Sequence, residues 1–242
     1  MEQPHSHNGS VDQGRRAIAK AFALDTEVPE AYLVKARIAY TYDWDWQAAE
    51  EAIEKALVLR PGDVTALRAR ANLATTLGQT SEAFATYRDL VARDPLDSTL
   101  PLGFVGQLVL ANELDEAESL LRRLLEQDPS ANGTNASLSW VLGEAGRYEE
   151  AMIYGRKEPV DFMRLNSVGY LEYKLGNIEA AVAVQEEMLR QYGDAASYQQ
   201  ASIAAGSGDA DKTMEWLERA YTSRDPGLTG IKVDPDFTLQ TP

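Results

Sequence analysis

The sequence predicts an all-α fold, a right-handed α-solenoid of antiparallel helix pairs, because one pattern recurs every 34 residues. Three stretches carry an apolar stripe at helical spacing, and a proline ends each of them. The three copies are Ala49, Ile53, Ala56 and Pro61, then Ala83, Tyr87, Leu90 and Pro95, then Ala117, Leu121, Leu124 and Pro129. A second observation is glycine at the end of the first helix of a pair, where a left-handed residue is needed. These glycines are Gly78, Gly146, Gly176 and Gly208.

The chain divides in order into a tail, a half repeat, six repeats and an extension. Residues 1–13 are polar and aperiodic, so we expect a disordered tail. Residues 14–29 match the second helix of a repeat whose first helix is missing. Such a helix lacks a neighbour on one side, so we expect that the chain is cut from a longer one on its N-terminal side. The array is predicted over 14–226, with repeats 30–63, 64–97, 98–131, 132–161, 162–193 and 194–226, followed by an extension at 227–242.

Composition excludes several functional classes. With 38 acidic and 23 basic residues the net charge is −15, and no basic cluster is longer than Arg-Arg, so direct nucleic-acid binding is not expected. No apolar run reaches about 18 residues, so no membrane helix is predicted. The chain has no cysteine, which fits a cytoplasmic location.

Catalytic, metal and cofactor sites are also not expected. Nucleophilic sets that use cysteine or histidine are excluded, because the only histidines are His5 and His7 in the predicted tail. Asp43 and Asp45 have the spacing that begins a calcium loop, but the third ligand and the glycine of that loop are missing. We interpret one of these aspartates as the N-cap of the following helix, and Asp209 as occupying the same turn in the sixth repeat.

The fourth repeat departs most from the pattern. Pro159 cuts its second helix short, because proline removes an amide donor and clashes with the preceding turn. Gly155 and Glu158 stand at positions that are apolar in the other repeats. We therefore expect poor packing in this repeat, and local opening at a lower free energy than in its neighbours.

The spacing resembles the tetratricopeptide repeat (TPR) family. In the first full repeat the family pattern of large, small and aromatic residues is met by Leu33, Ala36, Tyr40, Ala49, Ile53, Ala56 and Pro61. The resemblance implies that the first helix of each pair lines an inner groove and that this groove binds a ligand. The residues that it places on the groove are Val34, Ile38, Arg68, Asn72, Leu102, Trp140, Asn166, Tyr170, Tyr173 and Tyr198, with Ser202 on the same stripe.

A narrower resemblance concerns two segments. Residues 42–50, and residues 215–221 with 224–228 and 231–235, are similar to the TPR tails of bacterial class III adenylate cyclases and winged-helix transcriptional regulators. The chain departs from those tails after Pro235, where it continues Asp236, Phe237, Thr238. The resemblance implies a regulatory part of a bacterial signalling or transcription-control protein.

The predicted function is a non-enzymatic interaction module that binds a peptide or protein segment in the groove. Large aromatic side chains with a few amides and an arginine suit such binding, because Trp, Tyr and Arg dominate interface affinity. Two alternatives stay open, a small-molecule sensor that controls an output domain and a scaffold that self-associates as a homo-oligomer.

Overall fold

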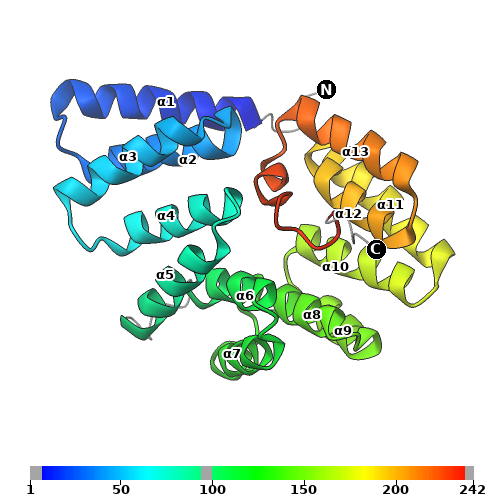
Figure 1. Ribbon diagram of the computed structural model, residues 1–242. Coiled ribbons are helices and arrows are strands. Elements are labelled where there is room, and N and C mark those ends of the chain that lie inside the picture. Colours follow the sequence, from blue (N-terminus) through cyan, green and yellow to red (C-terminus); the bar gives the residue numbers. More distant parts are fainter. Residues whose placement is uncertain (1–6, 94–99, 238–242) are drawn as a thin grey trace. The chain divides into compact units, whose positions relative to one another are not determined.

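The computed structural model describes residues 7–93 and 100–237 (Figure 1). Within these ranges the chain forms helices joined by short turns and contains no strand, which confirms the predicted all-α class. Among the described residues no helix is both long enough and apolar enough to cross a membrane. The chain comprises two compact units, residues 1–86 with 229–232, and residues 87–228 with 233–242.

The first unit is built from α1 (His7–Leu24), α2 (Pro29–Ile38), α3 (Trp46–Leu59), α4 (Val64–Thr76) and the start of α5 (Thr80–Arg93). α1 starts at His7, inside the stretch for which the sequence predicts disorder; residues 1–6 lie outside the described residues. Helices α2 and α3 pack as a pair, and α4 follows against α3. The core between α2, α3 and α4 consists of small and branched apolar side chains, Ala36, Ala39, Ala49, Ala52, Ile53 and Leu73.

Among its described residues, the second unit contains four further helix pairs. Their bounds are α6 (Leu100–Leu110) and α7 (Leu114–Gln127), α8 (Thr134–Glu144) and α9 (Tyr148–Gly155), α10 (Asp161–Lys174) and α11 (Ile178–Tyr192), and α12 (Ser197–Ser207) and α13 (Ala210–Ser223). Short 3₁₀ turns occupy Gly193–Ala196 and Pro226–Gly230. The first helices contact one another in the order α6, α8, α10, α12. They form one layer, which we call the first-helix layer of the second unit.

Each helix pair turns at a residue with left-handed backbone. The glycines predicted for this role have φ of 78° at Gly78, 73° at Gly146, 78° at Gly176 and 78° at Gly208. In the pairs that lack glycine here the backbone is the same, with φ of 56° at Trp44 and 59° at Asn112. Trp44 follows a π-helical turn at Ala39–Asp43, which lengthens the end of α2. The geometry of the turn is therefore kept without glycine, at the steric cost that a side chain has in this region.

The capping interpretation of the aspartates is confirmed. Asp45 accepts a hydrogen bond from the N–H of Ala48 at 2.9 Å, and Asp209 accepts one from Lys212 at 3.0 Å. Each bond satisfies a backbone donor in the first turn of the helix, α3 and α13 respectively. Asp43 instead pairs with Arg15 of α1 at 2.5 Å.

The expectation of poor packing in the fourth repeat is wrong. Glu158 is 1% exposed, and its carboxylate accepts hydrogen bonds from the N–H groups of Gly133 and Ala136, each at 3.0 Å. It thereby satisfies donors at the start of α8, as an N-cap would. Gly155 is buried, and a Cβ there would lie 3.0 Å from Ser139 Oγ and 3.2 Å from Ser167 Cβ. Its lack of a side chain lets α9 approach α8 and α10 closely.

Candidate functional site

The predicted groove residues fall on both compact units. Four of them belong to the first unit, namely Val34, Ile38, Arg68 and Asn72. Ile38 is 6% exposed, and its Cδ1 lies 3.0 Å from the position that a Cβ on Gly14 of α1 would take, so it packs against α1. Val34, on α2, and Arg68 and Asn72, on α4, are half-buried.

The other six predicted residues lie on the first-helix layer of the second unit: Leu102, Trp140, Asn166, Tyr170, Tyr173 and Tyr198. Leu102 is half-buried near Gly133. Asn166 is half-buried, and its Oδ1 has no hydrogen-bond donor within reach. The hydroxyl of Tyr173 donates to Gln185 of α11 at 2.8 Å. This bond ties Tyr173 to the second helix of its own pair, so its hydroxyl is engaged before any ligand binds.

Tyr170 lies between neighbouring first helices. A Cβ added to Gly206 of α12 would be 3.3 Å from its ring, and one added to Gly143 of α8 would be 4.0 Å from it. The ammonium of Lys174 lies over the same ring, 5.0 Å from the centroid, in a cation–π contact. Burial, together with the negative charge of Asp236, raises the pKa of the Tyr170 hydroxyl, which therefore stays protonated as a donor.

Trp140 offers the most accessible ring of the layer. Its side chain is 38% exposed, and Nε1 donates to Glu144 one turn further along α8 at 3.1 Å. Burial raises the pKa of Glu144, although the bond from Trp140 and the charge of Lys174 oppose the shift. An exposed indole beside a partly buried carboxylate combines an apolar contact surface with a hydrogen-bond acceptor.

Tyr198 is buried by residues that follow α13 in the sequence. Its hydroxyl donates to Asp234 Oδ2 at 2.6 Å, and its ring lies 5.4 Å from the ring of Phe237. Its backbone N–H donates to Asp225 Oδ2 at 3.1 Å. A Cβ on Gly227 would come within 2.5 Å of the Tyr198 ring, so only glycine fits there. Tyr198 is thus covered by the chain itself.

Residues 234–237 form a turn on this layer, the 234–237 turn, drawn in red beside α12 in Figure 1. Asp234 closes it, because Oδ1 accepts from the N–H of Asp236 at 2.9 Å and its carbonyl accepts from Phe237 at 3.2 Å. Pro235 stands at the second position, where its fixed φ favours such a turn. Ser202, one turn along α12 from Tyr198, donates its hydroxyl hydrogen to the carboxylate of Asp236.

The carboxylate of Asp236 sits in an unfavourable environment for a charge. Burial raises its pKa to about 6, and the charges of Asp234 and Glu144 act in the same direction. The bond from Ser202 and the charge of Lys174 oppose the shift. Asp236 is thus bonded to α12 through Ser202, and charges on α8 and α10, those of Glu144 and Lys174, act on its carboxylate. The repeat pattern places Tyr198 and Ser202 on the first-helix stripe, but it does not predict that residues 234–237 bind to them, because this turn is not part of a repeat.

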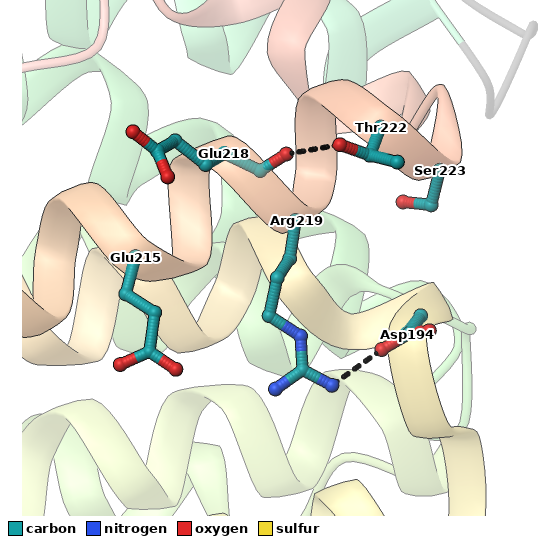
Figure 2. A pocket seen from close by; sticks show the side chains of 6 residues that line it. All are labelled: Asp194, Glu215, Glu218, Arg219, Thr222 and Ser223. Carbon is teal, nitrogen blue, oxygen red and sulfur yellow. Dashed lines mark hydrogen bonds and ion pairs between the residues drawn. The ribbon is translucent and has the colours of Figure 1, made fainter.

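A surface hollow lies elsewhere, on α13 and the 3₁₀ turn before α12 (Figure 2). Its lining is Asp194, Glu215, Glu218, Arg219, Thr222 and Ser223. Arg219 pairs with Asp194 at 2.7 Å, and Thr222 Oγ1 donates to the backbone carbonyl of Glu218 at 2.9 Å. The hollow contains none of the predicted groove residues, and its cation is already paired, so we do not take it as the candidate site.

The fold defines a helical-repeat scaffold, with aromatic side chains on the first-helix layer of its second unit. The tetratricopeptide repeat family model matches residues 45–98 and 108–161, so these two segments contain tetratricopeptide repeats. The match confirms the family resemblance for these segments, and repeats of this kind stack into extended surfaces that are typical of protein-interaction modules. No curated protein sequence matches the chain. The likeness to adenylate cyclase and winged-helix regulator tails has no support from these comparisons.

Solved structures agree with this fold. The chain is similar to PilW, a type IV pilus biogenesis factor, at 20% identity and a TM-score of 0.61, covering 87% of this chain and 92% of that one. A thermophilic TPR protein of Thermus thermophilus aligns at 18% identity and a TM-score of 0.62, covering 81% and 98%. PilF of Pseudomonas aeruginosa aligns at 14% identity and a TM-score of 0.56, covering 87% and 90%.

Proposed function

We propose that this protein is a non-enzymatic interaction module that binds a peptide or protein segment on the first-helix layer of the second unit. The observation that carries the proposal is the 234–237 turn, a short peptide that this layer already holds. It is held by two side-chain hydroxyls and one ring contact, from Tyr198 and Ser202. These are the contacts by which interfaces hold peptides.

Trp140 and Tyr170 form the centre of the proposed surface. The ring of Tyr170 lies close to Gly143 of α8 and Gly206 of α12, the two helices that neighbour α10. Trp140 is exposed on α8. Rigid rings supply contact area at low cost in side-chain entropy. Polar groups beside them, Glu144 and Lys174, are able to orient the backbone or a charged side chain of a partner.

The biological setting that we propose is the regulatory part of a bacterial signalling or transcription-control protein in the cytoplasm. Its basis is the sequence resemblance of residues 42–50 and 215–235. PilW and PilF share the fold at 20% and 14% identity, and identity this low carries no role in pilus biogenesis to this chain.

The test begins with selection of peptides from a displayed random library on the full chain. Affinity of a selected peptide is then measured for the parent and for Trp140→Ala/Tyr170→Ala. Truncating a buried aromatic anchor costs about 2 kcal/mol or more, so we expect affinity to fall about thirtyfold or more. Met214→Ala is the control, because Met214 is an exposed apolar residue on α13, outside the layer.

The outcomes separate the alternatives. Unchanged affinity in a double variant with unchanged melting temperature would contradict the proposed centre. The small-molecule sensor would be favoured if the selected peptides contact only a single pocket around Trp140 and Tyr170, and if metabolites displace them from it. Dimerisation that the double substitution abolishes would favour the self-association scaffold.

A further inference from the structure

The 234–237 turn is seated as a ligand would be. Two carboxylates, two residues apart in sequence, accept hydrogen bonds from two hydroxyls that are one helical turn apart on α12. Asp234 accepts from Tyr198 at 2.6 Å, and Asp236 accepts from Ser202. The phenyl ring of Phe237 lies against the ring of Tyr198, with centroids 5.4 Å apart and planes inclined at 60°. Charge-assisted hydrogen bonds and a tilted ring pair are specific in geometry.

The turn is also organised by its own residues. Asp234 accepts from two following N–H groups, and Pro235 restricts the backbone at the second position. A short segment that is folded before it docks loses less entropy on binding than a flexible one. A partner segment with the same residue pattern would therefore form the same turn and present the same groups.

The position of the turn distinguishes it from a segment that only caps the end of the repeat array. A cap needs to cover only the last helix pair, α12 and α13. The 234–237 turn is hydrogen-bonded to Tyr198 and Ser202 of α12, on the layer that contains the aromatic centre. The charges of its carboxylates also act on Glu144 of α8 and on Tyr170 of α10, and they raise the pKa of each. The charge of Asp234 is repulsive toward Glu144, so this approach does not by itself stabilise the array.

We propose that the 234–237 turn is an intramolecular ligand that covers a docking site for a partner protein. The partner presents an acidic turn of the same chemistry, two carboxylates that flank a proline with an aromatic residue next, and it displaces the chain's own turn. This inference rests on the proposed function and deepens it, because it names the partner's chemistry and a competitor in the same chain. Tyr198 and Ser202 are the docking residues.

The probe is a fluorescent peptide with the sequence of residues 231–237, Ile-Lys-Val-Asp-Pro-Asp-Phe. Its affinity is measured for the full parent chain and for the open variant Asp234→Ala/Asp236→Ala/Phe237→Ala. A short tether gives the internal turn an effective concentration of about 1 mM. A probe with a Kd of about 100 μM for the open site should then bind the parent about tenfold more weakly.

Two further variants test the docking residues. In the open variant, Tyr198→Phe with Ser202→Ala removes both hydroxyl donors while keeping the ring, and we expect probe affinity to fall about tenfold or more. The control is Asp211→Ala in the open variant, because Asp211 is an exposed carboxylate on α13. A peptide with the same composition in scrambled order should not bind.

Each outcome decides the proposal. Equal probe affinity for parent and open variant, or binding that survives loss of both hydroxyls, overturns it. If the open variant does not fold, Phe237→Ala alone decides, since it removes only the ring contact: probe binding about threefold or more tighter than in the parent supports the proposal, and no gain overturns it. Parent dimers that the open substitutions abolish would make a second copy the occupant and overturn the external partner.

The proposed function fails separately. If library peptides bind through Trp140 and Tyr170 while the probe does not bind the open variant, only this inference is overturned. If neither kind of peptide binds, both are.

Discussion

At the scale of single residues, the buried carboxylate of Glu158 organises the loop before α8. Oε1 accepts from the N–H groups of Gly133 at 3.0 Å and Val160 at 3.2 Å, and Oε2 accepts from Ala136 at 3.0 Å. Buried backbone donors that lose their acceptor cost about 1–3 kcal/mol each. We expect Glu158→Ala to lower the free energy of unfolding by about 3 kcal/mol, measured by urea denaturation.

Glu158→Gln distinguishes the role of each oxygen. The amide oxygen of glutamine is able to replace Oε1 toward Gly133 and Val160, but its NH₂ group would then face the N–H of Ala136. We expect a loss about half that of the alanine variant. Glu126→Ala, an exposed carboxylate on α7, should change stability by less than about 0.5 kcal/mol. Equal stability of Glu158→Ala and the parent would contradict this account.

At the scale of helices, alanine sets how closely the two helices of a pair approach. Ala49 and Ala117 are fully buried at the start of α3 and α7. Leucine at either position overpacks the crossing, and we expect it to cost about 1–3 kcal/mol, observed as a lower melting temperature. The matched control is Ala183→Leu, because Ala183 is an exposed position on α11. Melting temperatures that equal the parent's for both buried variants would mean that the repeat register is wrong.

The features that the sequence predicts correctly are those set by local interactions. The repeat period, the left-handed glycines and the Asp45 cap each depend on residues within one turn or one hairpin. The repeat pattern does not predict the role of Glu158, because a group that donates to it, the N–H of Gly133, lies 25 residues away in sequence. The same holds for Tyr198 and Asp234, 36 residues apart. Periodicity predicts which side of a helix faces its neighbour, and it contains no information on a non-repeating segment that folds back.

At the scale of the whole molecule, acidity dominates. The chain has a net charge of −15, and the surroundings of Asp236 in the 234–237 turn share this excess of carboxylates. The charged and titratable groups that act on Asp236 are Asp234, Glu144 and Lys174. The tyrosine hydroxyls on which these carboxylates act, Tyr170 and Tyr198, have raised pKa values and stay neutral. Docking of the turn therefore depends on the protonation of Asp236.

We expect docking of the turn to weaken as pH rises. The pKa of Asp236 is about 6 in the docked turn, against 3.8 for an unperturbed aspartate, so the docked state binds the proton more tightly. Docking is strongest below pH 3.8, weakens progressively up to about pH 6, and stays constant at its weaker level above that pH.

The measurement is the side-chain carboxyl ¹³C chemical shift of Asp236 in the full chain, which should titrate near pH 6. Asp234→Asn or Glu144→Gln should lower that midpoint by removing a like charge, whereas Ser202→Ala should raise it by removing a donor to the carboxylate. A midpoint near 3.8 in the parent, unmoved by all three substitutions, would mean that Asp236 is solvated and that the turn does not sit on the layer.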